Sequence, residues 1–312
     1  MITRLIAFTA VLPAMVCVPW PARAALVCEA DLVSLDFGQI SVRDGMPEQT
    51  SGPITISCSG GVPDTIATAC VMIGAGSGGS GPGLTPRYMT GVGTAVLEYQ
   101  LTAQNTFSGG GSTWETVGFT LPLDATGSAT IAPTLYAEVT SIGAQATVGP
   151  YASDFASGGD VQLAYGESDC SQYGTASSFD VRTTVAASCT VSVSNMDFGV
   201  IDAAVVAPVD QIATISVSCT NASSYSVGLD MGRQPEGVGP AGRRMTNGVN
   251  VLAYGLYHDG AATAAWGLGA ENVAAGIGTG GNQTLTVFGR IFPDQVAAVG
   301  RYSDSVVVIV NY

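Results

Sequence analysis

The sequence has no lysine, and its ten basic residues, all arginine, stand against 24 acidic residues, which leaves a formal net charge of −14. A chain so poor in basic side chains cannot form the positive surface that nucleic acids and anionic lipids require. Neither is therefore expected as a partner.

Metal ligands and catalytic groups are equally scarce. The chain has one histidine, His258, and no cysteines at CxxC spacing, so neither a metal site nor a cofactor is predicted. Asp259 follows His258, but neighbouring strand residues point to opposite faces and cannot cooperate as a catalytic triad does. We expect no enzymatic activity. The alternative, a secreted polysaccharide hydrolase, would need two carboxylates facing each other in a cleft.

Long helices and long apolar runs are missing after residue 24. Charged residues make up only 11% of the chain, and no later segment shows the 3.6-residue period of an amphipathic helix. Glycine, in contrast, is abundant at 41 residues, among short runs rich in valine, threonine and serine. This composition is typical of strands joined by glycine-rich turns and predicts an all-β fold.

Residues 1–24 have the pattern of a secretory signal peptide. Arg4 precedes an apolar stretch at residues 5–18, and small residues at 22 and 24 mark a cleavage site. A membrane anchor is the alternative, but the stretch is short and broken by prolines. Export through the periplasm would leave six cysteines, an even number that predicts disulfide bonds.

The sequence contains an internal repeat. One five-residue motif recurs 161 positions later: Cys28, Asp36, Phe37, Gly38 and Cys58 match Cys189, Asp197, Phe198, Gly199 and Cys219. The match continues in order through residues 97–101 and 252–256, Trp114 and Trp266, residues 149–151 and 300–302, and Tyr165 and Tyr312. An ordered series of this kind indicates two copies of one unit. We expect domains at 25–176 and 188–312, joined by a linker at 177–187.

Each copy shows strand periodicity. Leu97, Tyr99 and Leu101 lie on one face of a period-2 strand, and residues 54–58 alternate large apolar with small polar side chains. The pattern predicts two tandem β-sandwiches, each with its own cysteine pair. The two cysteines without counterparts are left to pair with each other, a free thiol at either position being the alternative. The predicted disulfide bonds are Cys28–Cys58, Cys189–Cys219 and Cys70–Cys170.

The ordered motif set resembles the spore coat protein U domain, a family that includes subunits of archaic chaperone–usher pili. Two such domains in one chain resemble the tip adhesin of these pili. The resemblance implies an immunoglobulin-like sandwich that lacks one strand and accepts a donor strand from the adjacent pilus subunit. It also implies a periplasmic chaperone, an outer-membrane usher and a final place at the cell surface, on the pilus tip. The rival within the same fold is a structural spore-coat or fibre-body protein without an attachment role.

The C-terminal segment, residues 305–312, is apolar on both faces. An exposed apolar edge strand is an aggregation hazard, and a strand added from another chain removes the hazard. We expect the donor-strand groove in the second domain to be bordered by Val306, Val308, Val310 and Tyr312. The alternative is a central strand of a complete sheet.

The linker alternates apolar and polar side chains, with Phe179, Val181 and Val185 on one face. We hypothesise that residues 177–187 complete the first domain in cis, the alternative being a flexible linker. Cleavage after Ala24 would leave three residues before Cys28, about 10 Å of chain, too short to donate a strand. A subunit that accepts but cannot donate is expected at the tip.

Adhesion would be carried by long glycine-rich loops of the first domain, at residues 74–87, 105–118 and 142–158. Apolar side chains at the loop tips would bind an abiotic or host surface by burying apolar area. The candidates are Leu84, Phe107, Trp114 and Val148. The alternative for each is packing under its own loop, and the match with Trp266 favours packing for Trp114.

Overall fold

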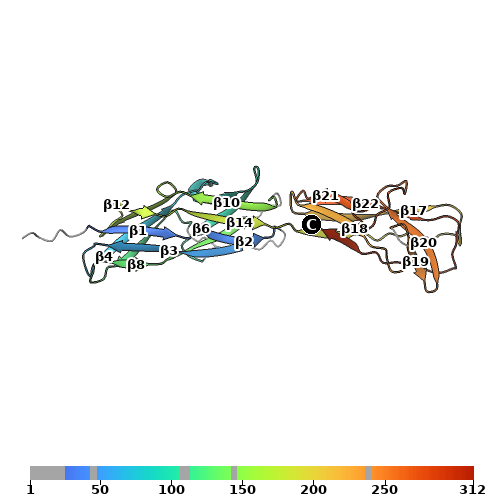
Figure 1. Ribbon diagram of the computed structural model, residues 1–312, viewed down its shortest axis with the longest axis horizontal. Coiled ribbons are helices and arrows are strands. Elements are labelled where there is room, and N and C mark those ends of the chain that lie inside the picture. The colour runs from blue at the N-terminus through green and yellow to red at the C-terminus, as the bar shows by residue number, and fades with distance from the viewer. Residues whose placement is uncertain (1–24, 43–47, 106–112, 142–145, 236–239) are drawn as a thin grey trace, which may run out of the picture.

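The computed structural model describes residues 25–42, 48–105, 113–141, 146–235 and 240–312, the side chain of Ser141 excepted. Two β-sandwiches lie end to end and form an elongated molecule (Figure 1). Within the described residues the only helical element is a 3-10 turn, η1 (Pro82–Leu84). None of the described segments forms a helix long and apolar enough to cross a membrane. The predicted all-β fold with two tandem domains is confirmed.

The described residues of the first sandwich form fourteen strands. Its strands are β1 (Val27–Leu32), β2 (Leu35–Ile40), β3 (Glu48–Ser59), β4 (Ile66–Ile73), β5 (Arg87–Thr90), β6 (Val96–Thr102), β7 (Thr116–Pro122), β8 (Ala129–Ile131), β9 (Thr134–Ser141), β10 (Gly149–Phe155), β11 (Val161–Gly166), β12 (Gln172–Tyr173), β13 (Thr175–Ala176) and β14 (Phe179–Val185). One sheet has the order β13-β1-β3-β9-β6-β5-β10-β14-β2, with β8 beside β3, and the other has the order β12-β11-β4-β7.

In the second sandwich the structure describes ten strands. Its strands are β15 (Cys189–Val193), β16 (Ala204–Val205), β17 (Val209–Cys219), β18 (Ser224–Leu229), β19 (Arg243–Asn247), β20 (Asn250–Tyr257), β21 (Ala274–Ile277), β22 (Asn282–Ile291), β23 (Gln295–Val296) and β24 (Val308–Asn311). The two main sheets have the orders β15-β17-β22-β20-β19 and β21-β18-β24, and β16 pairs with β23.

The alternating strands place their apolar side chains between the sheets, as the sequence predicts. In the first domain Leu97, Tyr99 and Leu101 of β6 are fully buried, and the matching residues of β20 are buried in the second. All three predicted disulfide bonds are present. They are Cys28–Cys58, Cys70–Cys170 and Cys189–Cys219. In each domain the first pair links directly opposed residues of the first strand and its antiparallel neighbour.

A buried arginine fastens the core of each domain. The guanidinium of Arg87 donates to the carbonyls of Ile73, Gly74 and Trp114, with Nη2 of Arg87 2.8 Å from Ile73 O and Nε 2.7 Å from Gly74 O. Arg243 repeats the arrangement in the second domain. Burial lowers the pKa of Arg87 to about 10, because the charged form loses hydration. The sequence analysis missed this pair, although an Arg-x-Met sequence at 87–89 and 243–245 marks it.

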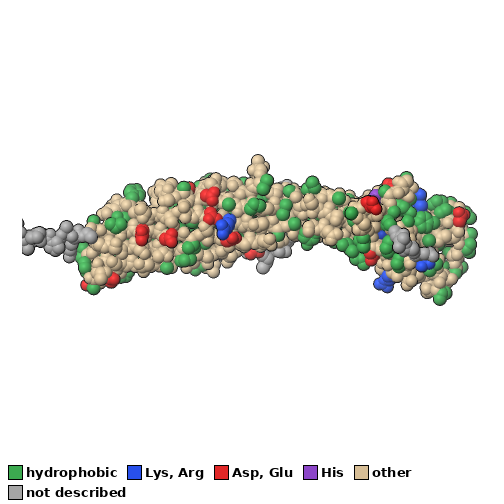
Figure 2. Space-filling model, viewed as in Figure 1, with side chains coloured by type: hydrophobic (Ala, Val, Ile, Leu, Met, Phe, Trp, Pro, Cys, Tyr) green, Lys and Arg blue, Asp and Glu red, His purple; other side chains and the backbone are tan. Residues whose placement is uncertain are grey.

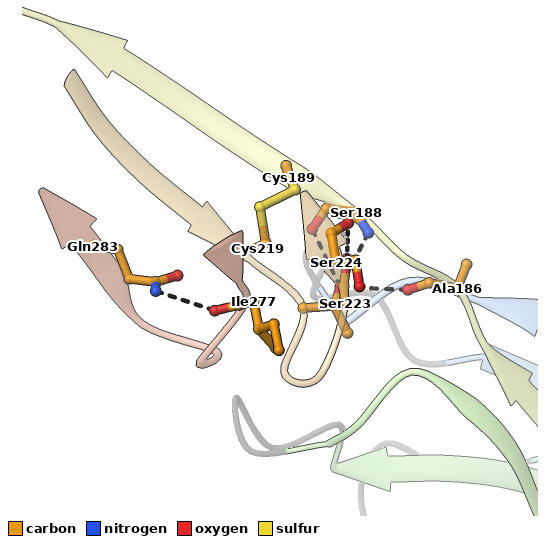
Figure 3. The surroundings of a disulfide bond; sticks show 9 residues. Ala186, Ser188, Cys189, Cys219, Ser223, Ser224, Ile277 and Gln283 are labelled. Atoms are coloured by element: carbon orange, nitrogen blue, oxygen red, sulfur yellow. Dashed lines mark hydrogen bonds between the residues drawn. A yellow bond between two sulfur atoms is a disulfide. The ribbon is translucent and has the colours of Figure 1, made fainter. Parts of the chain in front are cut away.

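The connection between the two domains is short. Only Ala186, Ala187 and Ser188 separate β14 of the first domain from β15 of the second. Figure 3 shows Ala186 and Ser188 beside the Cys189–Cys219 disulfide. The first sandwich thus includes β14, which lies in the segment 177–187 that the sequence analysis treated as a linker and hypothesised to complete the first domain in cis.

Candidate functional site

The last strand of the first domain, β14, lies between two strands that are far from each other in sequence. It pairs antiparallel with β10, from Gly149 opposite Val185 to Phe155 opposite Phe179, and parallel with β2. The preceding short strands extend the cover: β12 pairs with β11, and β13 pairs with β1. Residues 172–185 therefore close the first sandwich along both borders.

The inward face of β14 is apolar because alternate side chains reach the core. Phe179, Val181 and Val185 are buried, and the ring of Phe179 stacks on Phe155 at a centroid distance of 4.5 Å. Thr183, also buried, donates from its hydroxyl to the carbonyl of Gly38 at 3.0 Å. The strand is held by packing and by backbone pairing on both sides, so it belongs to the fold of the first domain.

The outward face of β14 carries an ion pair. Nε of Arg182 lies 3.0 Å from Oδ2 of Asp36, the residue directly opposite in β2. The other carboxylate oxygen of Asp36 accepts a hydrogen bond from the backbone of Gly38 at 2.7 Å. That bond and Arg182 lower the pKa of Asp36 below its ordinary value, because both favour the charged carboxylate.

The second domain has no strand in the corresponding place among its described residues. Strand β24 pairs only with β18, and β15 pairs only with β17, so each is an edge strand. Residues 194–203, which include the counterpart of β2, form no strand. We call the segments 189–201 and 300–312 the acceptor edges of this domain. Side chains from both segments pack on the same core.

Equivalent residues of the two domains differ in side-chain exposure where the second domain lacks the closing strand. Ala30 and Leu32 of β1 are 4% and 5% exposed, whereas their counterparts Val191 and Val193 are 44% and 57% exposed. An apolar row of this kind along an unpaired edge favours pairing with a further strand.

The C-terminal acceptor edge shows the same difference. Tyr165, which β12 covers, is 6% exposed, and its counterpart Tyr312 is 61% exposed. Val306, Val308 and Val310, the residues predicted to border the donor-strand groove, are partly buried against the core. They alternate with exposed neighbours along the segment. Their groove role remains a prediction.

The structure places the residues predicted at adhesive loop tips in different surroundings. The expectation is wrong for Trp114, which is fully buried and donates from its indole Nε1 to the carbonyl of Val71 at 3.1 Å. The backbone N–H of Val148 donates to the carbonyl of Asn221 in the second domain, at 2.9 Å, so this residue lies at the domain junction. Leu84 is partly buried in η1, and Phe107 lies outside the described residues.

A small pocket of about 150 Å³ in the second domain brings two carboxylates near each other, Asp210 and Asp259. Nε of Arg290 lies 2.6 Å from Oδ1 of Asp210 and lowers its pKa. Backbone N–H groups that include that of Ala264 lower the pKa of Asp259. A glycosidase needs one carboxylic acid with a raised pKa as proton donor, and here both pKa values shift the other way.

The other charged side chains, and the lone histidine, form no further candidate site among the described residues. On the face drawn in Figure 2, acidic side chains are scattered and basic ones are few. His258 stacks on Trp266 at 4.2 Å, and its Nε2 lies 3.0 Å from the carbonyl oxygen of Asn272. No group of three or more His, Cys, Asp or Glu suited to a metal ion occurs among the residues that the structure describes.

Comparison with solved structures relates this fold to pilus subunits. A chain from the complex of CsuC and the tip adhesion subunit CsuE, from archaic chaperone–usher pili of Acinetobacter baumannii, is 15% identical. The match has a TM-score of 0.51 and covers 92% of this chain and all of that one. The CupB6 tip adhesin of Pseudomonas aeruginosa is 9% identical, with a TM-score of 0.32 and coverage of 85% and 87%.

Sequence comparison gives the family. No curated protein matches the chain. The model of the Spore Coat Protein U domain, however, matches residues 15–156 and again residues 175–309, which together are most of the sequence. The second match begins within the strands that close the first sandwich. Two copies of the domain, each with its disulfide-linked first strand, make this chain a member of the spore coat protein U domain family.

Proposed function

We propose that the protein is the tip subunit of a chaperone–usher pilus, attached to surfaces by its first domain and joined to the next subunit by its second. The observation that carries the proposal is the contrast between the two sandwiches. Residues 172–185 fill in the first domain the position that stays open beside 189–201 and 300–312 in the second. A strand donated by the adjacent pilus subunit fits that position.

The use of β14 within the chain supports the tip position over the fibre body. This segment lies just before the first cysteine of the second domain, where it could otherwise reach another molecule. It is instead paired on both sides inside the first domain. A subunit with one open acceptor and an internally used donor ends a fibre, whereas a body subunit or a polymeric coat protein needs a free donor.

The proposed partners follow from the open acceptor edges. Exposed apolar strands would aggregate during export, so we propose that a periplasmic chaperone covers them until an outer-membrane usher brings in the next subunit. A complex of a chaperone with a tip subunit is known from the archaic chaperone–usher pili of Acinetobacter baumannii.

Attachment is assigned to the end of the first domain opposite the second. Strand β1 begins there and β4 lies there (Figure 1), and their first residues, Val27 and Ile66, are exposed. The turn before β4 is fastened to the turn after β7 by a hydrogen bond from Asp64 N to Asp124 O at 3.2 Å. We propose that these turns contact an abiotic or host surface through apolar side chains. Leu84 lies beside Arg87 and Ile73, at the other end of β4, and its part in adhesion stays a separate proposal.

The test of strand acceptance copies the connectivity of the first domain. There β11 ends just after Tyr165, the counterpart of Tyr312, and residues 166–171 lead into the closing strands. A second copy of residues 166–187, with Cys170→Ser in the copy, is appended after Tyr312 of the full chain. We expect the melting temperature of the second domain to rise by about 10 °C or more, because its acceptor edges become paired.

The matched control carries Phe179→Ser and Val181→Asp in the appended copy only. These changes remove the apolar face while leaving length and connectivity intact, so no rise is expected. Equal melting temperatures for the parent chain and both extended chains, measured by calorimetry, would rule out strand acceptance by the second domain.

A further inference from the structure

The backbone around the Asp-Phe-Gly motif has the same conformation in both domains. Gly38 and Gly199 have φ angles of 72° and 73°, in the left-handed region that glycine tolerates. Their N–H groups donate to Oδ1 of Asp36 and Asp197 at 2.7 Å and 2.8 Å. The two carboxylates are therefore presented in the same way, each with one oxygen held by the glycine N–H and the other directed to a different partner or to solvent.

The two carboxylates differ in what they meet. Asp36 is paired with Arg182 of β14. Asp197 is exposed and, within the described ranges, takes part in no ion pair. The closing strand β14 thus supplies Asp36 with a basic partner, and Asp197 has no such partner among the described residues.

We infer that the strand accepted by the second domain carries a basic side chain that pairs with Asp197, at the position that Arg182 occupies beside Asp36. This inference rests on the proposed function, because it specifies the chemistry of the donor. It also fixes the register, because the strand is to run parallel to residues 196–201 and antiparallel to residues 300–306, as β14 does in the first domain.

The two other outward-facing positions of the accepted strand are less suited to a basic side chain than the position of Arg182. In the first domain Asp180 lies opposite Asp154 and beside Ser34, whose counterparts are Ser305 and Asn195, both uncharged. Thr184 lies opposite Pro150, whose counterpart is Arg301, and a basic residue there would meet a like charge. Of the three outward positions only the central one is next to a carboxylate.

A basic side chain at this one position would help to set the register of the accepted strand. Apolar alternation alone permits slips of two residues, which keep the same side chains facing inward. A slip by two residues would separate the basic side chain from Asp197, and in one direction would bring it next to Arg301. The ion pair with Asp197 therefore contributes to register specificity more than to affinity. Exposed ion pairs contribute little to stability by themselves.

The test uses two peptides of equal composition and the full chain from residue 25 with its disulfide bonds formed. The first peptide is a synthetic copy of residues 172–187. The second carries Asp180→Arg with Arg182→Asp, so that its net charge is unchanged and only the placement differs. Binding is measured by fluorescence anisotropy of a dye at the peptide N-terminus. We expect the first peptide to bind about three-fold or more tightly than the second, the range of a surface ion pair together with removal of a like-charge contact.

Charge reversal on the protein identifies the partner. With Asp197→Arg the preference is expected to reverse, whereas Glu271→Arg, the same change at an exposed position outside the acceptor edges, is expected to leave it as it was. Equal binding of both peptides to the unaltered chain, or a preference that survives Asp197→Arg, overturns the inference and leaves strand acceptance standing. If neither peptide binds, strand acceptance fails and this inference fails with it.

Discussion

At the scale of single residues, the buried arginines Arg87 and Arg243 are the most demanding feature of each core. A guanidinium is planar and carries five N–H donors, so one side chain can serve several carbonyl groups at once. Each of these arginines joins the chain before its own strand, at Gly74 or Asp230, to the carbonyl of the buried tryptophan, Trp114 or Trp266. Packing and hydrogen bonding therefore depend on the same side chain.

We predict that Arg87→Met lowers the free energy of unfolding of the first domain by about 3–5 kcal/mol, because buried carbonyls lose their donors. Urea denaturation of the full chain measures the loss. Arg301→Met, at an exposed position, is the control and should change stability by less than about 0.5 kcal/mol. A loss below about 1 kcal/mol for Arg87→Met would show that water replaces the guanidinium.

At the scale of elements, the repeated Asp-Phe-Gly motif shows how a neighbour decides secondary structure. The first copy lies within β2, which pairs with β14, and the second copy forms no strand. Both copies have the same sequence and the same glycine conformation, so local preference is equal. A strand needs a hydrogen-bonding partner, and only the first copy has one.

For β14 itself, we predict that Phe179→Ala lowers the stability of the first domain by about 3–5 kcal/mol, because it removes a buried ring stacked on Phe155. The change is followed by urea denaturation together with limited proteolysis after residue 172. Thr184→Ala, on the opposite face of the same strand, is the control and should cost less than about 1 kcal/mol. Similar effects of the two substitutions would contradict a packed closing strand.

At the scale of the whole molecule, hydrogen bonds join the two domains at their short junction. The hydroxyl of the fully buried Thr220 accepts from the N–H of Ser188 at 3.1 Å and lies 3.3 Å from the carbonyl oxygen of Ala186. The hydrogen bond from Val148 N to Asn221 O adds a second point of contact. A force on the second domain would therefore pass through the junction into β14, which is paired along its length.

We predict that Thr220→Val loosens this junction without unfolding either domain, because valine keeps the shape of threonine and removes the hydroxyl. Backbone ¹⁵N relaxation should give one rotational correlation time for both domains of the unaltered chain and two different times for the variant. Thr214→Val, which removes an exposed hydroxyl in β17, is the control and should leave one common time. Unchanged relaxation in Thr220→Val would assign the rigidity to the other contacts.

The sequence by itself determined the duplication, the all-β fold, the disulfide bond that recurs in each copy and the inward faces of the strands at 97–101 and 252–256, whereas the Cys70–Cys170 bond was decided by the structure. These features follow from spacing and period-2 alternation, which are local properties of the chain. The sequence did not reveal that Arg87 and Arg243 are buried and donate to several carbonyl groups, because an isolated arginine gives no sign of which carbonyls will surround it.

Only the tertiary structure decided which segments close a sandwich and which side chains reach its ends. Trp114 looked like a loop residue and is in the core, and Val148 looked like a tip residue and lies at the junction. The same motif became a strand in one domain and an open edge in the other, because pairing is a contact between distant segments that no local pattern encodes.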